Sequence, residues 1–173
     1  YKPDPDQSEG KKLGPGIPEE FAEYLPYEYG FGTNVDNPIE AQLSETFRFL
    51  DLLREMNITL VNLSAGSPYY NPHIQRPAYY PPSDGYQPPE DPLVGVARQI
   101  AIVAQIKKAY PDFLFVGSAY SYLQEFLPHV CQKLVGDEMV DFIGLGRMVL
   151  SYPDLPVDVL QNGEMTKRKI CRT

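Results

Sequence analysis

The chain has 173 residues, of which 43% are hydrophobic and 22% are charged, which is enough for one globular domain with a substantial core. Its net charge of −8 argues against a nucleic-acid backbone or an anionic membrane surface as the main partner, but allows a small anionic ligand. No apolar run approaches a membrane span and no signal peptide opens the sequence, so we expect a cytoplasmic protein. Cys131 and Cys171 are too few for a disulfide scaffold, and we expect them as reduced thiols.

The sequence divides into two regions of different composition. Residues 1–36 are rich in proline, glycine and acidic side chains and predict an extended segment. Residues 37–173 carry the apolar periodicity of regular elements and predict the folded region. Because the sequence opens on Tyr1 rather than methionine and stops after Thr173 without a terminating signal, we expect a fragment of a longer chain.

The first predicted helix begins at Asn37 and Pro38, a capping residue followed by a residue favoured in the first turn. Apolar residues at helical spacing continue to about Met56, and Asn57 can end the helix in the left-handed conformation. Residues 59–63 then predict a strand.

A long loop follows this strand. Residues 64–91 are rich in proline and tyrosine and show neither a helical nor a strand period. A loop of this length inside a compact domain is uncommon and is more often functional than not.

The remaining sequence alternates between helix and strand. Ser121 and Gln124 have the spacing of a capping box, and Pro128 should kink that helix or restart it. In chain order we predict a helix from Asp91 and Pro92 to about Tyr110, a strand at residues 113–117, a helix at about residues 121–135, a strand at residues 140–144, and a helix starting at Met148.

This order predicts an α/β fold with about three parallel strands, crossover helices and a long loop after the first strand. Three strands cannot close a barrel, and a (β/α)8 TIM barrel needs roughly 250 residues, so the chain fits the C-terminal portion of one. The rival is a small open doubly wound sheet, but no glycine-rich dinucleotide fingerprint follows any predicted strand.

The carboxyl ends of parallel strands are where function lies in α/β proteins. Three segments are expected to meet there: residues 64–73, 117–121 and 144–147. The last two contain glycines after consecutive strands, and residues 144–147 add Arg147, whose planar guanidinium matches a phosphate. The pattern therefore predicts a phosphate site.

Residues 140–156, Val-Asp-Phe-Ile-Gly-Leu-Gly-Arg-Met-Val-Leu-Ser-Tyr-Pro-Asp-Leu-Pro, resemble the final strand motif of the old yellow enzyme family, the NADH:flavin oxidoreductases. In that family an aspartate and two or three apolar residues precede Gly-x-Gly-Arg, and Pro-Asp follows a few residues later. Residues 116–118 resemble the preceding strand, and residues 52–66 resemble the sixth helix–strand unit. The resemblance covers most of residues 39–173 and implies the last three strands of an FMN-binding TIM barrel.

The resemblance also implies a set of cofactor-binding residues. Gly117 and Ser118 would hold the FMN phosphate through their backbone N–H groups. Gly144, Gly146 and Arg147 would form the second half of the same site, with the Arg147 guanidinium paired to the phosphate. Ser118 and Gly144 could instead be simple turn residues.

Tyr69, Tyr70 and His73 lie just past the first predicted strand and could line a substrate pocket; for His73 the alternative is a surface or loop-packing histidine. The family's proton donor and several flavin-ring contacts lie on earlier strands that this chain lacks, so we assign no catalytic residue. We give His129 no role. The two cysteines and two histidines lack the spacing of a metal site.

The implied function is that of an FMN-dependent oxidoreductase, which takes hydride from NAD(P)H and passes it to a small molecule such as an activated alkene. The fragment alone would be inactive. Two alternatives stay open. One is a non-redox TIM-barrel enzyme that binds a phosphorylated substrate. The other is a non-catalytic half-barrel that associates with another chain, or with itself as a homo-oligomer, through exposed sheet edges.

Overall fold

The computed structural model describes residues 1–10, 12–79 and 85–172. The chain forms two compact units, one made of Tyr1–Ile17 with Leu60–Thr173 and the other of Pro18–Thr59. The boundary expected at residue 36 therefore falls inside the second unit. Within the described ranges, no helix combines the length and the apolar character needed to cross a membrane.

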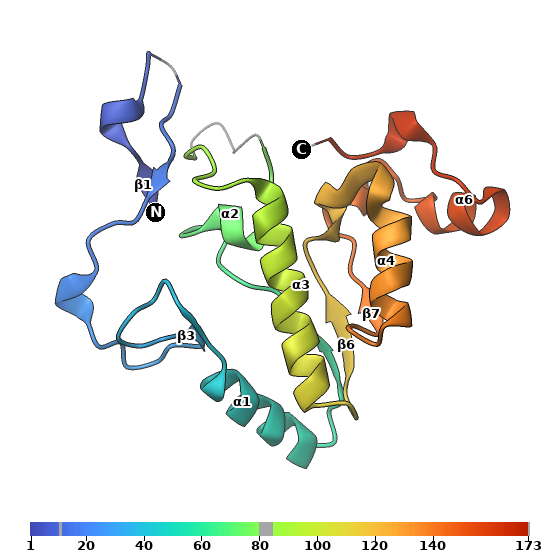
Figure 1. Ribbon diagram of the computed structural model, residues 1–173, viewed down its shortest axis with the longest axis horizontal. Helices are drawn as coiled ribbons and strands as arrows, with labels where there is room; N and C mark the ends of the chain where they lie inside the picture. Colours follow the sequence, from blue (N-terminus) through green and yellow to red (C-terminus); the bar gives the residue numbers. More distant parts are fainter. Residues whose placement is uncertain (11, 80–84, 173) are drawn as a thin grey trace. The chain divides into compact units, whose positions relative to one another are not determined.

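The first unit carries the parallel sheet and most of the helices (Figure 1). Its elements in chain order are β1 (Lys2–Pro3), η1 (Pro5–Gln7), β2 (Gly16–Ile17), β5 (Leu60–Asn62), α2 (Pro72–Gln75), α3 (Pro92–Ala109), β6 (Leu114–Gly117), η3 (Tyr120–Phe126), α4 (Leu127–Gly136), β7 (Phe142–Ile143), α5 (Arg147–Ser151), α6 (Leu155–Asn162) and η4 (Lys167–Lys169).

The second unit contains a short hairpin and one helix. Its elements are η2 (Ala22–Tyr24), β3 (Gly32–Thr33), β4 (Ala41–Gln42) and α1 (Ser44–Glu55). Asn57 follows α1 with a φ of 58°, which is the predicted left-handed end of this helix.

The predicted start of this helix is wrong: α1 begins at Ser44 rather than at Asn37. Thr33 pairs with Ala41 in an antiparallel ladder, and the N–H of Glu40 donates to the carbonyl oxygen of Asn37 at 3.0 Å. Because the ladder fixes β4 in an extended conformation, the Asn–Pro pair forms the turn of a hairpin and cannot open a helix.

The three predicted parallel strands are confirmed. They form one sheet in the order β5-β6-β7, with Val61 opposite Phe115 and Gly117 opposite Ile143. The connections between these strands run through α3 and α4, as a parallel arrangement requires.

The two faces of this sheet differ in burial. Phe115 is fully buried, and α3 packs against β6 (Figure 1). On the opposite face Leu60, Leu114 and Phe142 are 59%, 44% and 49% exposed. Since side chains alternate along a strand, one face of the sheet is covered and the other presents apolar side chains to the outside.

The helix predicted from Ser121 is replaced by two elements, the 3-10 helix η3 and the α-helix α4. Pro128 lies in the first turn of α4, so the predicted restart at this proline is confirmed. The capping box is wrong, because the buried Ser121 hydroxyl accepts a hydrogen bond from the N–H of Met148 at 3.2 Å instead.

The hydrophobic core lies among α3, η3, α4, α5 and α6. Its buried members are Val103, Tyr120, Leu127, Cys131, Leu134, Val140, Met148, Tyr152, Leu155 and Ile170. The cap predicted for α3 is confirmed, since the Asp91 carboxylate accepts a hydrogen bond from the N–H of Leu93 at 2.8 Å.

The long loop after β5 contains one short helix, α2, and part of the loop lies outside the described residues. The loop is held by a buried side chain of α3. Gln99 is 3% exposed, and its Nε2 donates to the carbonyl oxygens of Ile74 at 2.6 Å and Gln75 at 3.4 Å. Side-chain hydrogen bonds to the backbone thus replace the regular ladders that this segment lacks.

Candidate functional site

A cavity of about 330 Å³ lies at the carboxyl ends of β5, β6 and β7. The three segments expected at this edge all contribute to its wall, together with residues at the end of α2. The lining residues are Asn62, Ser64, Gln75, Arg76, Ser118, Ala119, Ser121, Gly144, Leu145, Gly146 and Arg147. Four of the five predicted cofactor-binding residues are thus brought together, and Gly117 lies behind the wall as the last residue of β6.

The charges of this cavity are of one sign. Its described lining includes Arg76 and Arg147 and no aspartate or glutamate. Burial is the main cause that lowers the pKa of the Arg147 guanidinium; Cys171 opposes this shift, and the nearby charge of Arg76 adds a smaller lowering. Two cations of a chain with a net charge of −8 therefore lie close together without an acid in the same cavity, which favours an anionic ligand.

Arg147 is the first residue of α5 and is half-buried. Its Nη2 donates to the carbonyl oxygen of Pro77 at 2.6 Å, which links α5 to the loop after β5. The contact holds the long side chain in one place, so less rotamer entropy would be lost when a ligand binds.

Two of the predicted glycines have a packing reason. A Cβ on Gly117 would lie 2.3 Å from the hydroxyl oxygen of Tyr120, and one on Gly144 would lie 2.5 Å from the carbonyl oxygen of Gly117. The N–H of Gly144 donates to that same carbonyl at 2.8 Å, so it extends the pairing of β6 and β7. The Tyr120 ring therefore requires a small residue at position 117, and the close approach of β6 and β7 requires one at position 144.

Gly146 differs from the other two glycines. It lines the cavity, and a Cβ at this position would meet no protein atom within 4 Å. Protein packing therefore does not explain the glycine. A side chain here would instead extend into open space, so the glycine leaves room for a ligand beside the backbone.

The turn after β6 supplies hydroxyl groups to the cavity. Ser118 donates through its Oγ to the Oδ1 of Asn62 at 3.1 Å, which joins the ends of β6 and β5. Ala119 follows in the left-handed conformation with a φ of 75°, and Ser121 is held by the N–H of Met148. Hydroxyl, amide and guanidinium groups are donors suited to phosphate oxygens.

The three residues predicted to bind substrate do not line this cavity. Tyr69 and Tyr70 are 88% and 73% exposed on the loop. His73 is buried on α2, with its Nδ1 2.7 Å from the hydroxyl oxygen of Tyr86. Burial is the main cause that lowers the pKa of His73, and the ring packs within the loop against Tyr86.

The sequence interpretation missed Arg76, the second cation of the cavity. Its position follows a strand by more than ten residues, inside a segment without regular periodicity. The available signal was a lone arginine beside Pro77 in a proline-rich loop, at the strand edge where ligands bind.

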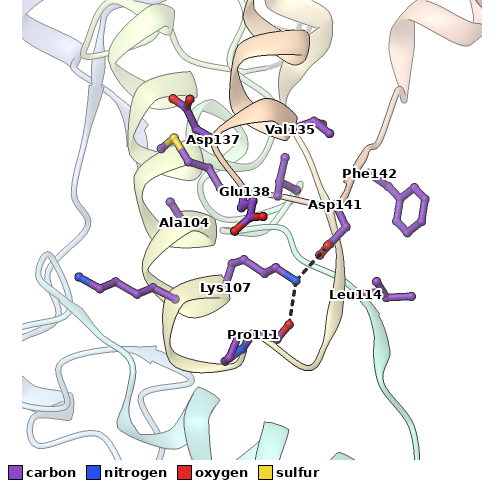
Figure 2. A pocket seen from close by; sticks show the side chains of 12 residues that line it. Ala104, Lys107, Pro111, Leu114, Val135, Asp137, Glu138, Asp141 and Phe142 are labelled. Carbon is purple, nitrogen blue, oxygen red and sulfur yellow. Dashed lines mark hydrogen bonds and ion pairs between the residues drawn. The ribbon is translucent and has the colours of Figure 1, made fainter.

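A larger cavity of about 820 Å³ lies at the opposite ends of β6 and β7, and its lining mixes lysines with acids (Figure 2). Figure 2 shows the Nζ of Lys107 pointing at Asp141, 2.9 Å from its Oδ1, and Lys107 also donates to the carbonyl oxygen of Pro111 at 3.2 Å. Because this charge is used within the fold, we take the smaller cavity as the candidate site.

Among the described residues, no three His, Cys, Asp or Glu side chains gather in a way that could hold a metal ion. Comparison of the chain with protein-family models, curated proteins and solved structures gives no significant match.

Proposed function

We propose that this chain provides the phosphate site of an FMN-dependent NAD(P)H oxidoreductase of the old yellow enzyme type. The observation that carries the proposal is the cavity at the strand ends. It unites Ser118, Gly144, Gly146 and Arg147, residues named from the motif resemblance, in one cationic wall free of acids among its described members.

The residues of the cavity fit a phosphate monoester, which carries between one and a half and two negative charges at pH 7. In the proposal Arg147 pairs with the phosphate oxygens, Ser118 offers its backbone N–H, and Gly146 allows the ligand to approach the main chain. The chemistry that bound FMN supplies is hydride transfer from NAD(P)H to an acceptor such as an activated alkene.

The bare face of the sheet supports a larger barrel. Parallel sheets are normally covered on both faces, whereas Leu60, Leu114 and Phe142 are exposed. We propose that these side chains belong to the interior of a (β/α)8 barrel, in which inward-pointing residues of other strands cover them. The residues that act on the substrate would then lie on those other strands, and this chain alone would be inactive.

Identification of a bound chromophore tests the function. The full-length protein should purify yellow, and heat or acid should release a compound with the mass and phosphate content of FMN. A colourless full-length protein that takes up no added FMN but binds sugar phosphates would support the non-redox enzyme instead.

The same bare face favours a second candidate, in which two copies of this chain cover each other's sheets. Sedimentation of the 173-residue chain distinguishes this self-associating half-barrel from the flavin enzyme. A concentration-dependent dimer that binds no flavin would support the half-barrel that associates with itself.

A further inference from the structure

Arg76 lies in a segment whose backbone is fixed on both sides. The N–H of Arg76 donates to the carbonyl oxygen of Pro72 at 2.8 Å, which closes the end of α2. Gln99 holds the two preceding carbonyl groups, and the guanidinium of Arg147 holds the carbonyl of Pro77, whose side chain is fully buried. The stem of Arg76 therefore starts from a defined position although the residue lies in a loop.

Among the residues that the structure describes, the guanidinium of Arg76 has no protein partner that would explain this arrangement. Across residues 1–10, 12–79 and 85–172 it makes no hydrogen bond or ion pair. The side chain is exposed and borders the cavity in which Arg147 also lies. An arginine without an acid partner among the described residues, close to a second arginine, raises the free energy of the folded chain unless something offsets the repulsion.

We propose that Arg76 is a second ligand-binding guanidinium of this cavity, and that the pair Arg76 and Arg147 selects a dianionic phosphate monoester over singly charged anions. The inference rests on the proposed phosphate site and extends it to a residue on the loop after β5. Each guanidinium offers a planar fork of donors, so two of them satisfy both charges and up to three oxygens of a terminal phosphate. A carboxylate or a phosphate diester carries a single charge and would leave one of the two cations without a counter-charge.

Gln99 acts as a positioning residue for Arg76. It does not line the cavity, but its amide fixes the carbonyl oxygens of Ile74 and Gln75. Replacement by leucine would keep the volume and release both carbonyl groups, so Arg76 would leave its place.

Affinity for FMN and for riboflavin, measured by flavin fluorescence with the full-length protein, tests the proposal. Arg76→Gln should weaken FMN binding about tenfold and leave riboflavin binding unchanged, because riboflavin lacks the phosphate. Arg168→Gln removes the same charge from an exposed residue outside the cavity and should change neither affinity by more than about twofold. Gln99→Leu should weaken FMN binding in the wild-type background but weaken it little further in the Arg76→Gln variant. If Gln99→Leu instead disturbed folding in general, it would weaken FMN binding equally in both backgrounds.

Two outcomes separate this inference from the function on which it rests. If FMN binds and Arg76→Gln behaves like Arg168→Gln, the role of Arg76 is wrong and the phosphate site stands. If inorganic phosphate and glycerol phosphate compete with one another in an Arg76-dependent way, but FMN binds no more tightly than glycerol phosphate, the guanidinium pair stands and the flavin function fails.

Discussion

The Nη2 of Arg147 lies 2.6 Å from the carbonyl oxygen of Pro77, a residue 70 positions earlier in the chain. This hydrogen bond joins the turn after β7 to the loop after β5, on either side of the central strand β6. One arginine therefore fixes the wall of the cavity and presents a positive charge to it.

Substitution of Arg147 should affect both the cavity wall and the charge that faces the ligand. Arg147→Gln should weaken FMN binding at least about tenfold, because a charge-assisted hydrogen bond is worth about 1.5–3 kcal/mol. Arg147→Lys should lose less, since it keeps the charge but not the planar fork that reaches both partners. Flavin retained on gel filtration measures the effect, and retention by Arg147→Gln equal to that of the wild type would count against the site.

The glycines of the cavity should separate stability from binding. Gly144→Ala should lower the free energy of unfolding by about 1–3 kcal/mol, because its Cβ would meet the backbone oxygen of Gly117. Gly146→Ala should change stability by no more than about 0.5 kcal/mol, since a Cβ there meets no protein atom, yet it should weaken FMN binding. Urea titrations and flavin titrations measure the two effects, and unchanged FMN affinity in Gly146→Ala would show that the ligand does not approach this residue.

The ion pair in the larger cavity should be structural (Figure 2). The side chains of Lys107 and Asp141 are mostly buried. The Nζ of Lys107 also donates to the carbonyl oxygen of Phe113 at 2.7 Å, and Oδ2 of Asp141 accepts a hydrogen bond from the N–H of Phe115 at 2.8 Å. Lys107→Met should cost about 2–3 kcal/mol in urea unfolding, because it leaves the carboxylate without its cation. Lys108→Met, at the exposed neighbouring residue, is the matched control and should cost far less.

For this pair a second substitution provides the check. Lys107→Met combined with Asp141→Asn should regain part of the lost stability, since no charge then remains unpaired. If the double variant lost the full sum of the two single effects, the pair would not act as a unit.

The C-terminal segment should respond to pH through Asp158. The hydroxyl of Tyr152 donates to Oδ2 of Asp158 at 2.5 Å, and Thr166 adds a hydrogen bond at 3.1 Å. These contacts, the Tyr152 hydroxyl first, hold the pKa of Asp158 below its ordinary value. A lowered pKa stabilises the fold above the ordinary carboxyl range near about 4, and this stability is lost as the pH falls through the lowered value.

Asp158→Asn should therefore lower the melting temperature at pH 7, and the difference from the wild type should shrink as the pH falls from about 4 towards 2. Thermal unfolding across this range measures it. Asp154→Asn is the control, because the Asp154 side chain is 65% exposed and lies 3.5 Å from its ion-pair partner Lys169. A gap between Asp158→Asn and the wild type that stays constant with pH would contradict the assignment.

The sequence predicted the elements whose signals are local. The Asp91 cap and the three parallel strands depend on neighbouring residues and on the order of elements, and all are present. The predicted helix start at Asn37 was wrong because Ala41 pairs with Thr33 in an antiparallel hairpin. Pairing between strands is a tertiary effect that an isolated capping pattern does not contain.

The residues of the candidate site likewise divide into those with a local sequence signal and those placed by tertiary contacts. Ser118, Gly144, Gly146 and Arg147 could be found from their places after strands, and the structure brings them to one cavity. Arg76 had a weaker signal, a lone arginine beside Pro77, because it lies in irregular backbone whose neighbouring carbonyl groups, of Ile74 and Gln75, accept hydrogen bonds from Gln99 of α3. Contacts made by irregular backbone leave no period in the sequence.

Equilibrium titrations of the full-length protein with FMN and with riboflavin test the proposed phosphate site. With the phosphate between Arg147 and the turn after β6, FMN should bind at least about tenfold more tightly than riboflavin, and Arg147→Gln should remove the difference. Equal affinity for the two flavins, or a difference that survives Arg147→Gln, would contradict this placement.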